Sequence, residues 1–370
     1  MKFISLFASI CSLSLVTGCS KVTPDSSHAH TQTTTLAQLG ALQQCQQYSG
    51  LPNAWQKNQT AGMVWIAKGS FQLGSNQAYP DELNFGEKQR QVDGFWIDQT
   101  EVTVAQFSSF VKATNYITDA EKQKQAAVFS PNVNTSNQWW QLKADYTWKT
   151  PNGAKRQAPL PSEPVRYVTK NDAEHYAVWL GRDLPTEQEW EYAAKAMIGV
   201  QYMDENQEFG RIYPWDGRGV RNPYNVKRQG KQGDFLANFK RGRGDYAGIA
   251  GSRTNDGEII PTNVYDFPPN DFGLYNMAGN VNEWVQDVYR PLSYQDFDDL
   301  NPLRKDGVYD EEENYETSLF TDEMRVYKGG SWKDVAYWLA PGTRRFMHQD
   351  SATNNIGFRC AMISIGDKGK

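Results

Sequence analysis

Side-chain and backbone oxygens gather in one short segment, residues 276–283, in a spacing that suits a hard cation. Asn276 and Glu283 offer side-chain oxygens, and Gly279 and Val281 can offer backbone carbonyls. Calcium takes about six to eight oxygen ligands of these kinds. The segment therefore predicts a calcium site. The alternative is a set of ordinary Asx turns, in which the asparagine side chains bond only to nearby backbone.

The histidines offer too few ligands for a site that binds another metal. The chain has four histidines, and a three-histidine centre cannot be assembled from His175 and His348 alone. The other two, His28 and His30, lie in a polar stretch where a solvated linker is the alternative to metal binding. We predict no histidine-based metal centre.

The four cysteines divide by position along the chain. Cys11 lies in an apolar leader and Cys19 follows that leader directly, which leaves Cys45 and Cys360 near the two ends of the folded region. In an oxidising compartment such a pair predicts a disulfide. Two separate buried thiols are the alternative.

The amino terminus has the layout of a signal peptide. Lys2 precedes an apolar run, residues 3–16, that is too short to span a bilayer. The box Val16-Thr17-Gly18-Cys19 resembles the cleavage site of bacterial lipoproteins, in which Cys19 becomes the lipidated first residue. Ser20 favours the outer membrane by the same resemblance. We expect residues 1–18 to be removed and the protein to be lipid-anchored in the cell envelope, facing the periplasm, with a plain secretory signal as the alternative.

Composition bounds the rest of the chain. Residues 19–35 are polar and predict a disordered tether, and residues 36–370 predict one domain with long loops. The net charge of −5 argues against a nucleic-acid partner. Two loops are charge-biased: residues 218–243 are basic and residues 296–316 acidic. Solvated faces are the default interpretation of both, and their roles stay open.

The elements that must position these residues are short. Capping boxes at Thr103 and Thr186 predict helices that start at once after them, and a third helix is expected from about Asn171 to Gly181. Strands are expected at residues 63–67, 71–74, 95–98, 273–275, 281–285, 325–328 and 356–360.

Several motifs together resemble the formylglycine-generating enzyme, or sulfatase-modifying factor, family. They are Gly94–Asp98 with Glu101–Thr103, Leu184–Ala194, Tyr275–Trp284, Gly329–Trp332 and Gly357–Arg359, in the family's order. The resemblance implies an α+β class: the irregular formylglycine-generating-enzyme fold, a C-type lectin-like variant with low regular secondary structure. It also implies structural calcium, with a second site formed by the side chains of Asn238 and Asp256 and the carbonyls of Phe239 and Glu258.

The chain departs from the family where the oxidases bind copper(I). The family's two copper-binding cysteines correspond to Asp334 and Leu339, counted from Ser331, and no cysteine lies between Cys45 and Cys360. Because thiolate is the apt ligand for copper(I), we expect no copper. Asn282 also stands where the family usually has tryptophan.

The resemblance implies that these changes line the family's substrate cleft. Its candidate lining residues here are Ser331, Trp332, Asp334, Trp338, Arg344, Arg345 and His348. Asp334, Arg344 and His348 could form an acid–base or carboxylate-binding group, or they could be simple surface polar groups and salt-bridge partners.

Two functions remain open. One is a non-oxidase family member that binds an exported peptide, glycan or protein in an aromatic-lined cleft. The other is an enzyme that matures an exported protein or metabolite by oxidation or by acid–base chemistry, with formylglycine generation disfavoured by the missing cysteines.

Overall fold

The computed structural model describes residues 60–74, 88–129, 140–154, 158–196, 211–223, 232–240, 261–289 and 322–363. The predicted signal peptide, tether, lipidated Cys19 and acidic loop 296–316 lie outside these residues. Within the described part, no helix has the length and apolar character needed to cross a membrane.

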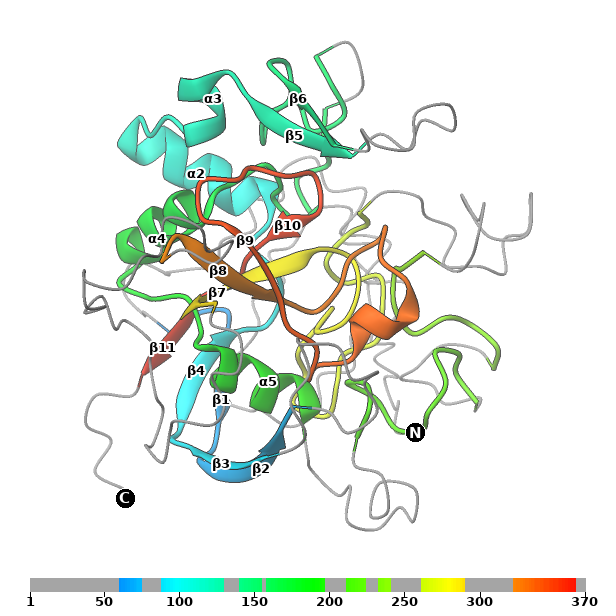
Figure 1. The fold of residues 1–370 in the computed structure, drawn as a ribbon. Helices are drawn as coiled ribbons and strands as arrows, with labels where there is room; N and C mark the ends of the chain where they lie inside the picture. Colours follow the sequence, from blue (N-terminus) through cyan, green and yellow to red (C-terminus); the bar gives the residue numbers. More distant parts are fainter. Residues whose placement is uncertain are drawn as a thin grey trace, which may run out of the picture.

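Short strands and short helices alternate along the chain, as the irregular α+β class requires (Figure 1). The strands are β1 (Met63–Ile66), β2 (Gly69–Leu73), β3 (Lys88–Val92), β4 (Phe95–Asp98), β5 (Ala126–Phe129), β6 (Trp140–Lys143), β7 (Asn282–Val288), β8 (Met324–Lys328), β9 (Arg345–His348), β10 (Ile356–Gly357) and β11 (Ala361–Ile363). The helices are α2 (Val104–Thr114), α3 (Asp119–Gln123), α4 (Lys170–Trp179), α5 (Glu187–Lys195) and the 3-10 turn η4 (Ala336–Leu339).

Two sheets have more than two strands, and one of them joins the two ends of the described chain. One has the order β1-β4-β11, so the carboxyl-terminal strand pairs with a strand near the amino end (Figure 1). The other has the order β10-β7-β8-β9, with β10 parallel to β7 and the remaining pairs antiparallel. The pairs β2-β3 and β5-β6 form separate two-stranded sheets. Strand β7 therefore lies inside a sheet, and its side chains meet neighbours on both edges.

Threonine capping boxes start the helices. Thr103 accepts from the backbone of Gln106 at the start of α2, and Thr186 accepts from that of Glu189 at the start of α5. Both predicted starts are confirmed. Helix α4 also begins with a capping box, formed by Thr169 and Asp172, which was not predicted. Each box satisfies amide N–H groups that have no partner inside the helix.

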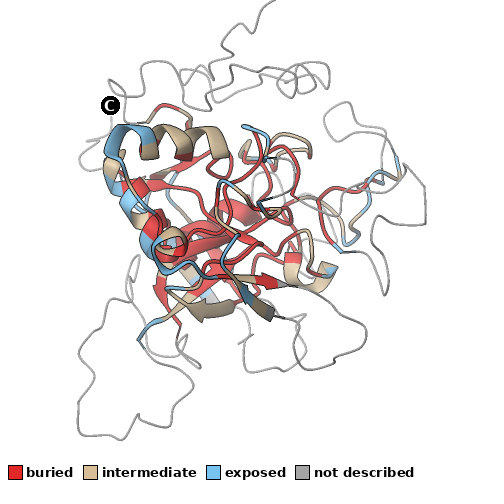
Figure 2. Ribbon diagram, turned by 90° about the horizontal axis from the view of Figure 1, so that it is seen from above, coloured by how far each residue is buried: buried red, intermediate tan, exposed pale blue. Residues whose placement is uncertain are grey.

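Helix α5 is buried along its whole length, including its charged side chains. Trp190, Ala193 and Ala194 pack into one core cluster with residues of β1, β2 and β4. A second cluster joins α2 and α4 to Trp284 of β7. Figure 2 shows the buried residues gathered through the centre of the molecule, with exposed turns on the outer side of the helices. Strand β7 touches both clusters, so its position is fixed from two sides.

Three differences from the predicted elements have clear causes. Residues 273–275 form bends rather than the predicted strand, because the side chain of Asn270 accepts from the backbone of Phe272 and Leu274. Strand β2 begins at Gly69, two residues before the predicted strand 71–74. Strands β3 and β9 were missed because the sequences KQRQV and RFMH show no clean apolar alternation.

Candidate functional site

The guanidinium of Arg359 and the carboxylate of Glu283 form the centre of the molecule's buried polar core. Nε of Arg359 lies 2.6 Å from Oε2 of Glu283, and its NH2 lies 2.7 Å from Oε1. The indole of Trp190 donates to Oε2 at 2.7 Å. Both charged side chains are 0% exposed. Glu283, a predicted calcium ligand, therefore already accepts three hydrogen bonds from protein groups.

Asn276 meets a different carboxylate. Its Nδ2 donates to Glu101 Oε2 at 2.9 Å, and Asn280 Nδ2 donates to Glu101 Oε1 at 2.9 Å. Burial raises the pKa of Glu101 to about 8. The positive charge of Arg359 lowers this pKa, and the negative charge of Glu283 raises it. At neutral pH a carboxyl group with this pKa is mainly protonated, and a cation bound beside it would favour its ionised form.

The Oδ1 atom of Asn276 is buried and accepts no hydrogen bond. Such an acceptor costs about 1–3 kcal/mol when left without a donor or a cation. A buried oxygen acceptor without a donor, beside a carboxyl group that a cation would help to ionise, fits a hard cation. The residues that would hold calcium here are Asn276, by its Oδ1, and Gly279 and Val281, by their carbonyls.

Gly279 brings the two predicted calcium segments together. It has φ +81°, and a Cβ on it would lie 2.4 Å from the carbonyl oxygen of Asn238. The same oxygen accepts from the backbone of Asn280 at 2.8 Å. Asn238 and Phe239 of the second predicted site are thus buried against the first, whereas Asp256 and Glu258 lie outside the described residues. Among the described residues there is no group of three or more His, Cys, Asp or Glu side chains that could hold a metal ion.

A second polar group surrounds Asp334, in the segment where the resemblance places the copper-binding cysteines. Ser331 donates to Oδ2 of Asp334, and Asn282 Nδ2 donates to the same oxygen at 3.1 Å. NH1 of Arg345 lies 2.7 Å from Oδ1. We call these four residues the Asp334 cluster. Ser331 and Asp334 are buried.

Aromatic rings hold the cationic member of the cluster. The guanidinium carbon of Arg345 lies 4.7 Å from the ring centre of Trp338 and 5.1 Å from that of Tyr327. Gly330 has φ +71°, and a Cβ on it would lie 2.7 Å from the carbonyl oxygen of Trp338, so the turn before Ser331 needs glycine. The Ser331 hydroxyl is thereby directed at a fixed carboxylate.

Two of the predicted cleft residues lie elsewhere. Arg344 is buried, with Nε 2.7 Å from Glu187 Oε1 on helix α5. His348 is partly exposed and bonds to Glu323 at 2.7 Å. Successive strand residues face opposite sides of a sheet, so in β9 Arg345 and His348 point to different faces. Among Arg344, Arg345 and His348, the structure places Arg345 against Asp334.

Trp332 is half-buried beside the cluster. Its backbone donates to the Asn280 carbonyl at 2.9 Å, and its indole lies 3.4 Å from the Asn354 carbonyl. Asn282 bonds through its backbone to the Asn355 carbonyl at 2.8 Å. The Oδ1 atoms of Asn282, Asn354 and Asn355 are all buried without a hydrogen-bond partner. These side chains leave acceptor capacity around the Asp334 cluster.

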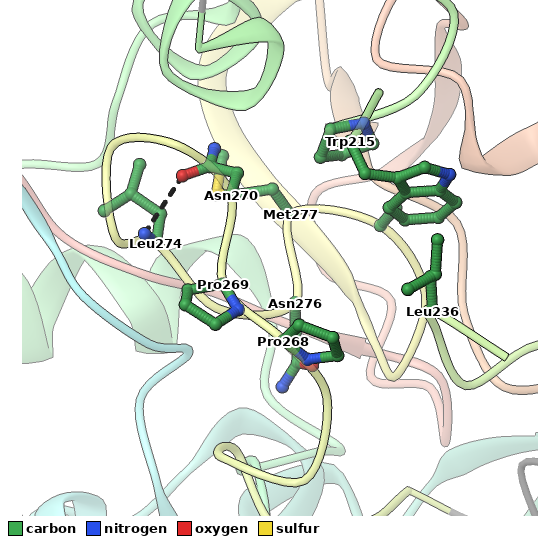
Figure 3. A pocket seen from close by; sticks show the side chains of 10 residues that line it. Trp215, Leu236, Pro268, Pro269, Asn270, Leu274, Asn276 and Met277 are labelled. Carbon is green, nitrogen blue, oxygen red and sulfur yellow. Dashed lines mark hydrogen bonds between the residues drawn. The ribbon is translucent and has the colours of Figure 1, made fainter. Parts of the chain in front are cut away.

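Residues 276–278 form part of the lining of a small pocket (Figure 3). Its lining is mainly apolar: Pro214, Trp215, Leu236, Pro268, Pro269, Asn270, Leu274, Asn276, Met277 and Ala278. In Figure 3, Asn270 lies on one side of it and Trp215 and Leu236 on the other. None of the predicted cleft residues lines this pocket.

Cys360 is buried in the second core cluster, and its thiol is not in a disulfide in the structure. Its backbone donates to Asp98 Oδ2 at 2.9 Å. Burial raises the pKa of the Cys360 thiol, and the charge of Asp98 adds to the shift. Cys45 lies outside the described residues, so the Cys45–Cys360 disulfide stays a prediction.

Short elements around two polar clusters define an irregular α+β protein, and comparison with known proteins gives its family. Residues 48–363 match the sulfatase-modifying factor enzyme 1-like domain. The chain therefore belongs to the formylglycine-generating enzyme family, as its motifs predict.

Relatives in the family differ in activity. The formylglycine-generating enzyme of Streptomyces coelicolor is 31% identical over 318 residues, which cover 82% of this chain and 89% of that protein. The inactive C-alpha-formylglycine-generating enzyme 2 of Mus musculus is 31% identical over 322 residues, covering 82% and 86%. The structure of PvdO from Pseudomonas aeruginosa has the same fold, with a TM-score of 0.53 at 22% identity, covering 82% of this chain and 94% of that one. Identity alone does not separate the active relatives from the inactive one.

Sequence reasoning missed three residues of these clusters. Glu101 and Arg359 were recognised only as parts of motifs, because no local spacing shows that residues so far apart in sequence lie near the same buried centre. Lys333 was overlooked between Trp332 and Asp334. The available signal was its position next to Asp334, which stands where the family has a copper-binding cysteine.

Proposed function

We propose that this protein is a non-oxidase member of the family that binds a peptide, glycan or protein partner at the Asp334 cluster. The observation that carries the proposal is the environment of the Asp334 carboxylate. Its two oxygens face the guanidinium of Arg345, the hydroxyl of Ser331 and the amide of Asn282. A hard carboxylate, Asp334, stands at one of the two cysteine positions and the apolar Leu339 at the other, so the cluster suits hydrogen bonding rather than copper(I) chemistry.

The surroundings of the cluster support recognition. Trp332 and Trp338 are half-buried, so each offers part of a ring to a partner. Aromatic rings beside a few directed polar groups are typical of binding sites.

The proposal includes location and structural metal. The protein is lipid-anchored through Cys19 in the outer membrane, faces the periplasm and carries its tether at residues 19–35. Calcium bound at Asn276, Gly279 and Val281 would supply positive charge to the Glu101–Glu283 centre and fix the loop. The fold is the C-type lectin-like variant, whose long loops carry the binding residues.

The first test is the oxidase reaction. The mature chain is incubated with a cysteine-bearing sulfatase peptide, copper(I) and oxygen, and the peptide is analysed by mass spectrometry. We expect no formylglycine, because no cysteine lies between Cys45 and Cys360. Formylglycine formed over many turnovers would overturn the proposal.

The second test compares partners. Wild type and Asp334→Ala are crosslinked in the cell envelope, and the captured proteins and glycans are identified. We expect at least one partner to be lost in the variant while circular dichroism and membrane fractionation stay unchanged. Lys122→Met, which removes an exposed ammonium paired with Asp119, is the matched control. Identical partner sets in all three proteins would contradict binding at this cluster.

A further inference from the structure

One face of the β1-β4-β11 sheet carries a row of apolar side chains that belong to none of the core clusters of the described residues. Strand register sets Trp65 of β1 directly opposite Trp96 of β4, and Trp96 directly opposite Met362 of β11. Side chains directly opposite each other point to the same face of a sheet. We call Trp65, Trp96 and Met362 the outer row.

The other face of the same sheet lies against the core. The residues that alternate with the outer row are buried in the core cluster around Trp190: Ile66, Phe95, Ile97 and Ala361. In the outer row, 37% of Trp65 is exposed, and the other two side chains are half-buried. Because successive strand residues face opposite sides, the sheet buries one apolar face in the protein and presents a second one outward.

The ring of Trp65 is held in place by its neighbours. Its centre lies 5.3 Å from that of Trp96, with 55° between the ring planes. A Cβ on Gly94 would lie 2.5 Å from the Trp65 indole, so this glycine leaves room for the ring beside the turn before β4. A side chain that is already held loses little conformational freedom when it docks. The outer row is thus arranged before any partner binds.

The size of the outer row argues against a second copy of the chain as its partner. A large aromatic side chain has about 150–250 Å² of surface, so the exposed parts of the three side chains amount to roughly a few hundred Å² at most. A stable protein interface needs about 800 Å² from each partner. The outer row therefore offers too little area for a stable dimer.

The course of the chain favours a lipid surface instead. The described chain begins at Thr60, shortly before β1, so the segment that joins Cys19 to the fold enters it through the strand that carries Trp65. About forty residues separate Cys19 from Thr60, and a flexible chain of about this length has an average span of about 35 Å. A domain tethered at this distance meets the bilayer at a high effective concentration, so a small apolar patch is sufficient.

Tryptophan also has the chemistry of the bilayer surface. Its large ring is apolar and carries one N–H donor, and tryptophan is enriched where hydrocarbon meets the headgroups. The exposed Lys68 and Asp93, in the turns that follow β1 and precede β4, carry opposite charges. Attraction to anionic lipids is therefore not the main contribution that we expect. Burial of apolar surface should dominate, and salt does not screen it as it screens exposed charges.

We propose that the outer row inserts into the surface of the phospholipid bilayer to which Cys19 anchors the protein, and so sets the orientation of the domain on the membrane. The inference rests on the lipid anchor of the proposed function. The η4 turn, orange in Figure 1, lies well away from β11 and contains Trp338, whose ring contacts Arg345 of the Asp334 cluster. A bilayer beside β11 thus leaves the Asp334 cluster free to bind its partner.

The first test measures lipid contact directly. The mature lipidated protein is reconstituted into vesicles of phosphatidylethanolamine and phosphatidylglycerol, with and without bromine on the acyl chains near the headgroups, because bromine quenches tryptophan fluorescence on contact. We expect quenching in wild type, and Trp65→Phe/Trp96→Phe should remove most of it. Trp179→Phe, at a half-buried tryptophan of α4, should keep it. Absence of quenching in wild type, or quenching that the double variant retains in full, overturns the inference.

The second test removes the lipid anchor. The full mature chain with Cys19→Ser is floated with the same vesicles in low and high salt. We expect a similar floating fraction in both, and Trp65→Ser/Met362→Ser should lower the partition constant about tenfold or more, because two apolar side chains no longer leave water. Val178→Ser, which removes a side chain of α4 that is 69% exposed, should match the parent chain. Equal flotation of the parent chain and the double variant in folded form overturns the inference.

A second copy of the chain is the competing occupant, and sedimentation of the Cys19→Ser chain tests it. We expect a monomer. A dimer that Trp65→Ser/Met362→Ser dissociates would assign the outer row to self-association and overturn its contact with lipid.

The inference and the proposed function can fail separately. Lipid contact through the outer row, together with identical partner sets in wild type and Asp334→Ala, supports the inference and contradicts binding at the Asp334 cluster. A partner that is lost in Asp334→Ala, together with wild-type fluorescence that brominated lipid does not quench, supports the proposed function and overturns the inference. A mature protein whose Cys19 carries no lipid by mass spectrometry contradicts the anchor.

Discussion

Arg359 holds Glu283 through two parallel hydrogen bonds, of 2.6 and 2.7 Å, at a point where neither side chain has any exposed surface. NH2 of Arg359 also donates to the Tyr275 carbonyl at 2.8 Å, and NH1 lies 3.1 Å from that of Asp98. One side chain thus ties β4, the segment before β7 and the carboxyl-terminal strands together. The pair also fixes Glu283 beside the Asn276 segment.

Breaking this pair should destabilise the fold strongly. We expect Arg359→Met to lower the free energy of unfolding by about 3–5 kcal/mol, because it leaves a buried carboxylate without its partner. Urea unfolding measures the change. The double variant Glu283→Gln/Arg359→Met should lose less free energy of unfolding than the two single variants lose in sum.

The control for that prediction is the exposed Lys122, whose Nζ lies 2.9 Å from Oδ1 of the partly buried Asp119. Lys122→Met should change stability by less than about 1 kcal/mol. Equal losses in Arg359→Met and Lys122→Met would show that the buried pair is not a main support of the fold.

Substitution by alanine should lower the stability of the fold more at Gly279 than at Gly273. Both glycines have positive φ, +81° and +83°, so alanine is strained at either position. A Cβ on Gly279 would lie 2.4 Å from a backbone oxygen, whereas one on Gly273 meets nothing within 4 Å. We expect Gly273→Ala to cost about 1 kcal/mol and Gly279→Ala clearly more, measured by thermal and urea unfolding. A smaller loss for Gly279→Ala would contradict the close approach to Asn238.

Calcium should raise the melting temperature, because it binds the folded state and scarcely the unfolded one. At a free concentration of about one hundred times its Kd, the gain is about 2.7 kcal/mol. Asn276→Ala should reduce or remove the shift, since it deletes a buried acceptor that has no other partner. Differential scanning fluorimetry with calcium, magnesium or chelator measures the shift in melting temperature. A melting temperature that changes with neither calcium nor chelator would count against the site.

Lys333 should make stability increase with pH. Its pKa is about 7 in the folded protein and 10.5 as the ordinary value, so between these limits the unfolded chain binds more protons. The free energy of unfolding then rises with pH from about 7 to 10.5, and the contribution is lost as pH falls through 7. Urea unfolding at pH 6, 8 and 10 should show a steeper rise for wild type than for Lys333→Met. Lys122→Met, the control, should follow wild type; parallel curves for wild type and Lys333→Met would contradict the depressed pKa.

The sequence by itself determined the features that depend on local rules or on counting. Thr103 and Thr186 each precede a side chain that completes a capping box, so α2 and α5 start where expected. The motif order identified the family. The absence of cysteine between Cys45 and Cys360 needs no structure.

Only the tertiary structure decided which side chains meet. Arg344, Arg345 and His348 are close in sequence, but the register of β9 against β8 sets Arg345 opposite Tyr327 and His348 opposite Met324. Arg345 therefore reaches Asp334, while Arg344 turns to Glu187 and His348 to Glu323. Glu283 likewise pairs with Arg359, 76 residues away. Such pairings follow from sheet register and core packing, which local spacing does not encode.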